Sequence, residues 1–215
     1  DPRVAGRGHA MLRAEGIEVT EGVRAEAAAA LQRGFLSRVT LGRPMVTLKL
    51  ATSFDGRIAT ATGESRWITG GAARRHVHLL RLTHDAVMVG AGTARADRPA
   101  LNVRGFGPVR QPVRVVLAND AIPPLPPEDA DHGPLWVLPG PPAGALAELG
   151  RRGITRVFCE GGGHLAAALL AGAFLIKAAM WPLCFWLPNA YSAAAPPVAA
   201  VFSIMTKVGV YTVIR

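Results

Sequence analysis

The chain has 215 residues, enough for one domain of ordinary size with a short appendage. It carries 24 basic and 15 acidic residues, which gives a formal net charge of +9. Such a balance permits binding to nucleic acid or to an anionic membrane. However, the arginines are scattered among acidic and turn residues without a Lys/Arg block, so the sequence does not favour a nucleic-acid-binding module.

Two cysteines, Cys159 and Cys184, are too few for a disulfide framework or a metal cluster. Cys159 ends an apolar stretch and is expected to be a small buried residue. The first residues do not resemble a signal peptide. We therefore expect no metal site, and a cytoplasmic location for residues 1–171.

Apolar periodicity and turn residues predict alternating strands and helices. Residues 1–40 look like the tail of a larger unit, with helices at 9–15 and 22–33 and a short strand at 17–20. Further strands are predicted at 46–51, 57–60, 86–89, 113–117, 135–138 and 156–159. Further helices are predicted at 72–82, at 143–152 and from 164 onward. This alternation is typical of an α/β sheet covered by helices.

Two residues near the first of these apolar strands have more than one interpretation. In the strand at 46–51, Val46 and Leu48 fall on one face and Lys49 on the other. Lys49 can therefore project into a cleft beside the sheet, or it can be an ordinary exposed lysine. Trp67 can be a core residue or a flat surface for a heteroaromatic ring.

Two glycine-rich turns, at 90–93 and 161–164, each connect a strand to a helix. Such turns let backbone N–H groups approach an anion at a helix N-terminus. Either turn could also be a tight connection, because neither matches a dinucleotide or P-loop fingerprint. Glu160 precedes the second turn, where a carboxylate is costly unless it binds something. Together with Arg81, Arg104 and Lys49, these turns favour a phosphorylated, nucleotide-like ligand.

Four sequence segments follow one another in a specific order. They are Lys-Leu-Ala-Thr-Ser-Phe-Asp-Gly-Arg at 49–57, Gly-Glu-Ser-Arg-Trp-Ile-Thr at 63–69, Asp-Arg-Pro-Ala-Leu-Asn-Val-Arg at 97–104 and Glu-Gly-Gly-Gly-His-Leu at 160–165. This pattern resembles the reductase domain of the bifunctional deaminase–reductase of riboflavin biosynthesis. The resemblance implies a dihydrofolate-reductase-like α/β fold for a domain at 41–171. It also implies NADPH-dependent reduction of 5-amino-6-(5-phosphoribosylamino)uracil to its ribitylamino product.

The resemblance further implies roles for individual residues. Lys49 and Glu160 would take part in catalysis. The phosphorylated pyrimidine substrate would contact Ser65, Arg81, Leu101, Arg104 and Glu160. The NADPH cofactor would contact Ala51, Trp67, Thr93, Asp97, Gly162, Gly163, His164, Leu165, Ala166, Ala167 and Ala168.

Residues 1–40 resemble the end of the family's deaminase domain. Zinc deaminases need a His-x-Glu and a Pro-Cys-x-x-Cys motif, and this sequence has neither. We therefore expect neither deaminase activity nor zinc.

From about residue 172 the chain becomes strongly apolar. Its Lys-x-x-x-x-Pro-x-x-x-Trp-Leu-Pro pattern begins at Lys177, and Lys207 follows in a second apolar stretch. Residues 173–215 thereby resemble the antiporter-like membrane component of multi-subunit sodium/proton antiporters, in which both lysines would lie in the proton path. We expect one or two transmembrane-like helices in 172–215 and membrane contact through 173–215.

The same segment replaces the strands that would complete the reductase sheet and its homodimer interface. An incomplete sheet exposes an edge, so the reductase could be inactive in this chain. The alternative function is a membrane-embedded fragment of a cation/proton antiporter component with a soluble extension.

Overall fold

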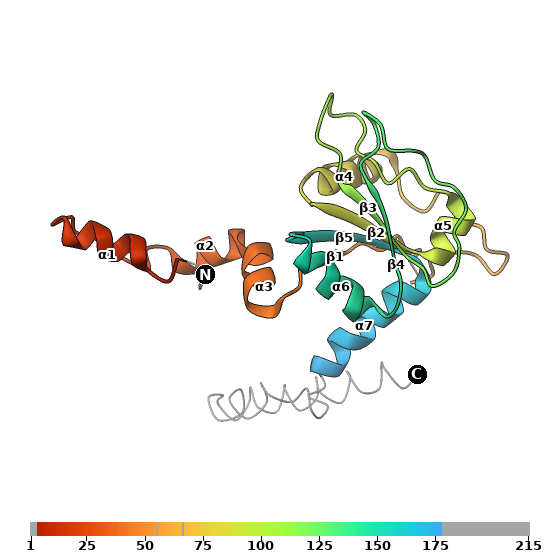
Figure 1. The fold of residues 1–215 in the computed structure, drawn as a ribbon. Coiled ribbons are helices and arrows are strands. Elements are labelled where there is room, and N and C mark those ends of the chain that lie inside the picture. The colour runs from red at the N-terminus through yellow and green to blue at the C-terminus, as the bar shows by residue number, and fades with distance from the viewer. Residues whose placement is uncertain (1–3, 55, 66, 178–215) are drawn as a thin grey trace. The chain divides into compact units, whose positions relative to one another are not determined.

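The computed structural model describes residues 4–54, 56–65 and 67–177 (Figure 1). The chain divides into two compact units, Asp1–Glu160 and Gly161–Arg215. Most of the antiporter-like segment, including Lys207, lies outside the described residues. The predictions made for 178–215 therefore stay predictions.

The first unit is built around a five-stranded sheet with strand order β1-β5-β2-β3-β4. The strands are β1 (Met45–Leu48), β2 (Ala86–Gly90), β3 (Val113–Leu117), β4 (Leu135–Leu138) and β5 (Arg156–Gly161). Three neighbouring pairs, β1 with β5, β2 with β3 and β3 with β4, run parallel. Because a parallel sheet is covered on both faces, its strands are short continuous apolar runs. The predicted α/β architecture is thus confirmed.

Helices accompany the strands in sequence (Figure 1). They are α4 (Gly71–Leu82) before β2, α5 (Ala91–Asp97) after it and α6 (Pro142–Arg151) before β5. Val87, Val116 and Phe158 belong to a buried apolar cluster, and Val77 and Leu80 of α4 pack against it. This packing fixes the face of α4 that the functional site uses.

The N-terminal residues form α1 (Arg7–Ala14), α2 (Ala25–Leu31) and α3 (Arg33–Leu41). The single helix predicted at 22–33 is therefore shorter, and α3 was not predicted. Gly34 allows α3 to pack closely against Thr155 and Arg156. A Cβ at this position would lie 2.7 Å from Arg156 Cγ and 2.8 Å from the Thr155 carbonyl oxygen, so only glycine permits this approach.

Two predicted strands are wrong. Residues 17–20 form no strand, and Ile17 is 51% exposed, so its apolar side chain has no sheet to cover. Residues 57–60 form an irregular loop with bends at 58 and 59 instead. There the Ser53 hydroxyl accepts the Arg57 N–H at 3.1 Å and the Thr60 hydroxyl accepts the Glu64 N–H at 3.0 Å. Such local side-chain bonds compete with a strand ladder.

The second unit contains α7 (Gly163–Lys177). Gly161 and Gly162 precede it with φ values of +83° and +95°, which favour glycine at both positions. Among the described residues, no helix combines the length and the apolar character needed to cross a bilayer.

Candidate functional site

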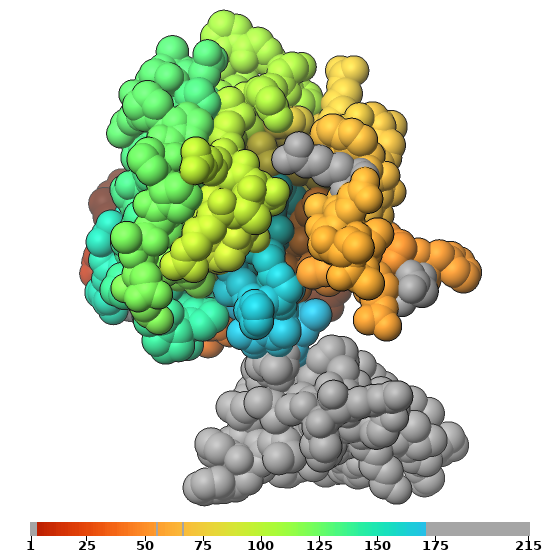
Figure 2. Space-filling view, turned by 90° about the vertical axis from the view of Figure 1, so that its right-hand side faces the viewer, coloured from red at the N-terminus to blue at the C-terminus, as the bar shows by residue number. Residues whose placement is uncertain are grey.

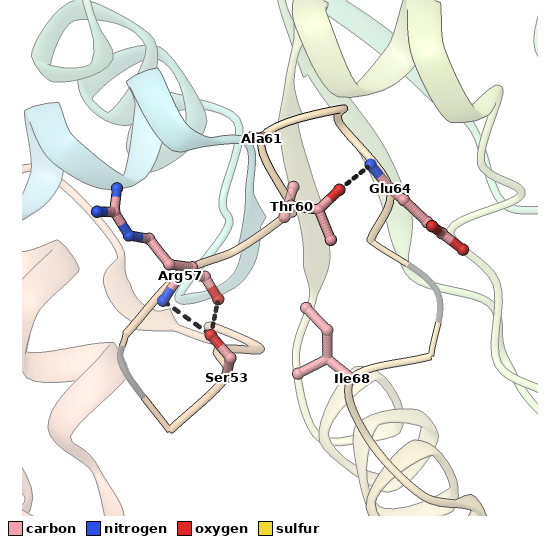
Figure 3. A pocket seen from close by; sticks show the side chains of 7 residues that line it. Ser53, Arg57, Thr60, Ala61, Glu64 and Ile68 are labelled. Atoms are coloured by element: carbon pink, nitrogen blue, oxygen red, sulfur yellow. Dashed lines mark hydrogen bonds between the residues drawn. The ribbon is translucent and has the colours of Figure 1, made fainter.

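Two adjoining cavities of the first unit bear on the predicted site. The larger, about 600 Å³, is lined by residues of one loop: Ser53, Arg57, Ala59, Thr60, Ala61, Glu64 and Ile68 (Figure 3). None of these is a predicted site residue. The smaller, about 250 Å³, is lined by Lys49, Ala51, Ser65, Trp67, Ile68, Thr69, Arg74, Val77, His78, Arg81, Arg104 and Glu160.

The smaller cavity is the better candidate, because it gathers chemistry from distant parts of the chain. Four of its lining side chains are cationic and one is a carboxylate, so it suits an anionic ligand. Ile68 lines both cavities, which therefore adjoin. In the space-filling view, the segment after β1 (orange to gold) and the segment that includes α5 (yellow-green) lie on opposite sides of a recess (Figure 2).

Strand pairing brings Lys49 and Glu160 to the same edge of the sheet. Leu48 lies opposite Cys159 in the parallel register, and the Lys49 N–H donates to the Cys159 carbonyl at 2.9 Å. The carboxyl ends of parallel strands meet at one edge, where open α/β sheets bind their ligands. Both side chains therefore reach the same pocket from neighbouring strands.

Helix α4 contributes one continuous face to the pocket. Val77 and His78 follow Arg74 by three and four residues and precede Arg81 by four and three, which places all four on one side of an α-helix. Since Val77 also packs on the core, the face cannot rotate away from the sheet without losing apolar contacts.

An ion pair joins α4 to β5 inside the pocket. Arg81 Nε donates to Glu160 Oε1, and Nη2 donates to Oε2 at 2.9 Å. The two side chains are only 11% and 13% exposed. Arg81 Nη1 also donates to the Asn102 carbonyl at 2.6 Å. A two-pronged pair of this kind fixes both side chains in orientation as well as in position.

His78 touches the same main-chain segment. Its Nδ1 lies 3.2 Å from the Asn102 carbonyl oxygen and 3.2 Å from the Arg104 backbone nitrogen. Burial lowers the pKa of His78, and the charges of Arg81 and Arg104 lower it further. The ring is therefore neutral at pH 7.

The segment that carries Arg104 is held by several hydrogen bonds. Gln111 accepts the Val103 N–H at 2.8 Å and donates to the Val103 carbonyl at 3.2 Å. The Asn102 side chain donates to the Asp131 carbonyl at 3.1 Å. Leu101 adopts a left-handed φ of +53° while its side chain is only 2% exposed. A bulky residue keeps this strained conformation only where its surroundings enforce it.

Trp67 lies at the surface of the pocket rather than in the core, since it is 73% exposed. The Arg74 guanidinium stacks over its ring at 4.3 Å and donates to the Thr69 carbonyl at 2.6 Å. The cation thus holds an exposed aromatic surface beside the other lining residues.

The structure brings together seven of the predicted site residues: Lys49, Ala51, Ser65, Trp67, Arg81, Arg104 and Glu160. Leu101 is a core residue, so only its backbone could face a ligand. Thr93 and Asp97 lie in α5 and do not line this cavity. Asp97 is the last residue of that helix.

The remaining predicted cofactor contacts, 162–168, belong to the second unit. They form the positive-φ Gly162 and the first turns of α7, in which the Ala166 N–H donates to the Gly162 carbonyl at 3.0 Å. This is the local geometry of a strand-to-helix turn that can receive an anion.

Sequence reasoning missed Arg74 and His78 as pocket residues. Their helical spacing from Arg81 was the available signal, because residues three and seven positions before a site residue share its helix face. Neither belongs to one of the four motifs, so reasoning from the motifs passed over them.

A family model described as the RibD C-terminal domain matches residues 44–175. The riboflavin biosynthesis protein RibD of Haemophilus influenzae is 35% identical over 204 residues, covering 79% of this chain and 55% of that protein. The RibD of Mycobacterium tuberculosis is 43% identical over 180 residues, covering 80% and 52%. That of Bacillus amyloliquefaciens is 48% identical over 117 residues, covering 54% and 32%.

Solved structures give the same result. RibD of Acinetobacter baumannii superimposes with a TM-score of 0.69 at 36% identity, covering 80% of this chain and 55% of that one. A Thermotoga maritima diaminohydroxyphosphoribosylaminopyrimidine deaminase/5-amino-6-(5-phosphoribosylamino)uracil reductase gives 0.67 at 33% identity, covering 80% and 54%.

The chain thus spans between about a third and just over half of the length of each relative cited above. A second family model, described as NADH:quinone oxidoreductase/Mrp antiporter, TM, matches residues 152–215. Its match overlaps the end of the first and covers less of the chain. On the first match, the chain belongs to the RibD C-terminal domain family.

Proposed function

We propose that this chain reduces 5-amino-6-(5-phosphoribosylamino)uracil with NADPH, giving the ribitylamino product. One observation carries the proposal: Lys49, Arg81, Arg104 and Glu160 line a single pocket together with the exposed ring of Trp67. The Thermotoga maritima relative, whose name includes this reductase activity, supports the choice of substrate.

The substrate suits the charges of the pocket. Its phosphate needs a cation, and Arg104 supplies one. Arg81 was expected to share this task, but three of its N–H groups already bond Glu160 and Asn102. We therefore assign Arg81 to orient Glu160, which in turn accepts hydrogen bonds from the amino or ring N–H groups of the pyrimidine.

The reaction requires a hydride and a proton. The ribosylamine opens to an imine, whose carbon receives the hydride and whose nitrogen receives the proton, so C=N becomes CH–NH. Lys49 is the proposed proton donor, because it is the ammonium that reaches the pocket from the carboxyl edge of β1.

A reduced nicotinamide cofactor would supply the hydride. The residues fit such a group, since Trp67 offers an exposed aromatic surface and Arg74 adds a positive charge beside it. The glycine turn at 161–163, with φ above +80° at Gly161 and Gly162, suits a pyrophosphate. By motif, Ala51, Thr93 and Asp97 complete the proposed cofactor contacts.

The test is a turnover assay on the purified full chain with NADPH and the phosphoribosylaminouracil. We expect substrate-dependent loss of reduced-nicotinamide absorbance and a product two hydrogens heavier by mass spectrometry. Lys49→Ala should lower kcat by about 100-fold or more, the range for a proton-transfer group. Arg75→Ala is the matched control, because Arg75 lies on α4 without lining the pocket. A wild-type chain that binds NADPH but forms no product would refute the proposal.

The antiporter alternative has one supporting observation, the family-model match to residues 152–215. It predicts that the full chain stays in membranes after alkaline washing. Recovery of the expressed chain in the supernatant would contradict it.

A further inference from the structure

His78 occupies a place that the proposed chemistry does not use. It lines the pocket from α4, between Arg74 and Arg81 on the same helix face. Its Nδ1 lies 3.2 Å from an acceptor, the Asn102 carbonyl oxygen, and 3.2 Å from a donor, the Arg104 backbone nitrogen. A single ring nitrogen cannot serve both at once, because it either carries a proton or offers a lone pair.

The other hydrogen-bond partners of the Asn102 carbonyl and the Arg104 N–H decide whether Nδ1 carries a proton or a lone pair. The Asn102 carbonyl already receives a charge-assisted bond from Arg81 Nη1 at 2.6 Å. The Arg104 N–H has no other acceptor among the described residues. With a lone pair on Nδ1, the Arg104 N–H has its acceptor and the Asn102 carbonyl keeps its donor, Arg81. A proton on Nδ1 would instead face the Arg104 N–H and compete with Arg81 for the carbonyl.

We propose that His78 is a positioning residue of this site: as a neutral imidazole it accepts the Arg104 N–H through Nδ1 and thereby fixes Arg104 for the substrate. The same arrangement leaves the Asn102 carbonyl to Arg81, which holds Glu160. His78 thus ties the Arg104 segment to the Arg81–Glu160 pair. The inference rests on the proposed function in that Arg104 is taken to contact the substrate.

Protonation would reverse this arrangement. The groups that act on the ring are Arg81 from its own helix, Arg104 from the segment beside it and Glu160 from β5, with the Asn102 carbonyl in direct contact. Lys49 and Arg74 line the same pocket. Burial and the two arginines hold the pKa of His78 below 6.5, against the opposing effects of Asn102 and Glu160. Below that pKa, Nδ1 becomes a donor and releases the Arg104 N–H.

The test compares His78→Ala with His78→Asn in the full chain. Asparagine places an acceptor oxygen near the position of Nδ1 but does not titrate. We expect His78→Ala to raise KM for the phosphorylated substrate about tenfold, as a misplaced binding group does, with KM for NADPH unchanged. We expect the wild type to lose kcat/KM at acidic pH, and His78→Asn should restore KM and remove that loss. An Asn variant as impaired as the Ala variant, or one with an unchanged acidic limb, would overturn the inference.

A second measurement does not depend on turnover. Hydrogen exchange at the Arg104 amide should be slow in the wild type and in His78→Asn, and at least tenfold faster in His78→Ala. If the wild type reduces no substrate yet shows this pattern, the proposed function fails and the role of His78 stands. Equal exchange rates at the Arg104 amide in all three proteins would refute the proposed role of His78, whatever the activity.

Discussion

Replacing Arg81 by alanine tests whether the Arg81–Glu160 pair is as desolvated as its exposure indicates. The variant leaves the Glu160 carboxylate, whose side chain is 13% exposed, without either of its two Arg81 bonds. It also removes the 2.6 Å donor from the Asn102 carbonyl. Breaking a buried ion pair from one side costs about 3 to 5 kcal/mol, and the pocket's access to water argues for about 3.

The assay is urea unfolding of the full chain, followed by circular dichroism. We expect the midpoint to fall in Arg81→Ala with little change in slope, because the folded state loses stability without losing its buried area. In a thermal scan the same loss corresponds to a drop of about 6 to 12 °C for a chain of this length.

The double variant Arg81→Ala/Glu160→Gln provides the sharper comparison. Glutamine removes the unpaired charge, so the double variant should recover about 1 to 2 kcal/mol relative to Arg81→Ala alone. A cost for Arg81→Ala below about 1 kcal/mol, the value of a surface pair, would refute the reasoning. A double variant no more stable than the single one would refute it as well.

Two further predictions concern the scaffold. Asp85 Oδ2 accepts the N–H and hydroxyl of Thr155, both at 2.7 Å, so Asp85→Asn should cost about 1 to 2 kcal/mol at pH 7 by urea unfolding. Burial raises the pKa of Asp85, but these bonds outweigh burial and lower the pKa overall, so its contribution is present at neutral pH and disappears as pH falls below 3.8. Gly150→Ala should lower the free energy of unfolding by about 1 to 3 kcal/mol or more, because the added Cβ would lie 2.2 Å from the Gly42 carbonyl oxygen.

Each of these has a control in the same chain. Asp120→Asn should change stability by less than about 1 kcal/mol at any pH, since this aspartate is 87% exposed and lies 3.8 Å from Arg95. Gly144→Ala, in the same helix as Gly150 but with open space around it, should stabilise by up to about 1 kcal/mol. If Gly150→Ala were as stable as Gly144→Ala, the close approach of α6 to Gly42 would be wrong.

The sequence by itself determined the alternation of strands and helices around the sheet. The strands predicted at 113–117 and 135–138 match β3 and β4, and the helix predicted at 72–82 matches α4 to within one residue. These elements could be predicted because short apolar runs and helical periodicity are local properties. The strands predicted at 17–20 and 57–60 failed because a strand also needs a partner, which no local pattern supplies.

The motifs indicated which residues matter, but only the tertiary structure decided how they share the work. Strand order and the register of Leu48 with Cys159 bring Lys49 and Glu160 to one edge. The packing of Val77 then turns one face of α4 into the pocket, which adds Arg74 and His78 and commits Arg81 to Glu160. These are contacts between residues far apart in the chain, and their geometry depends on burial and register that sequence spacing does not encode.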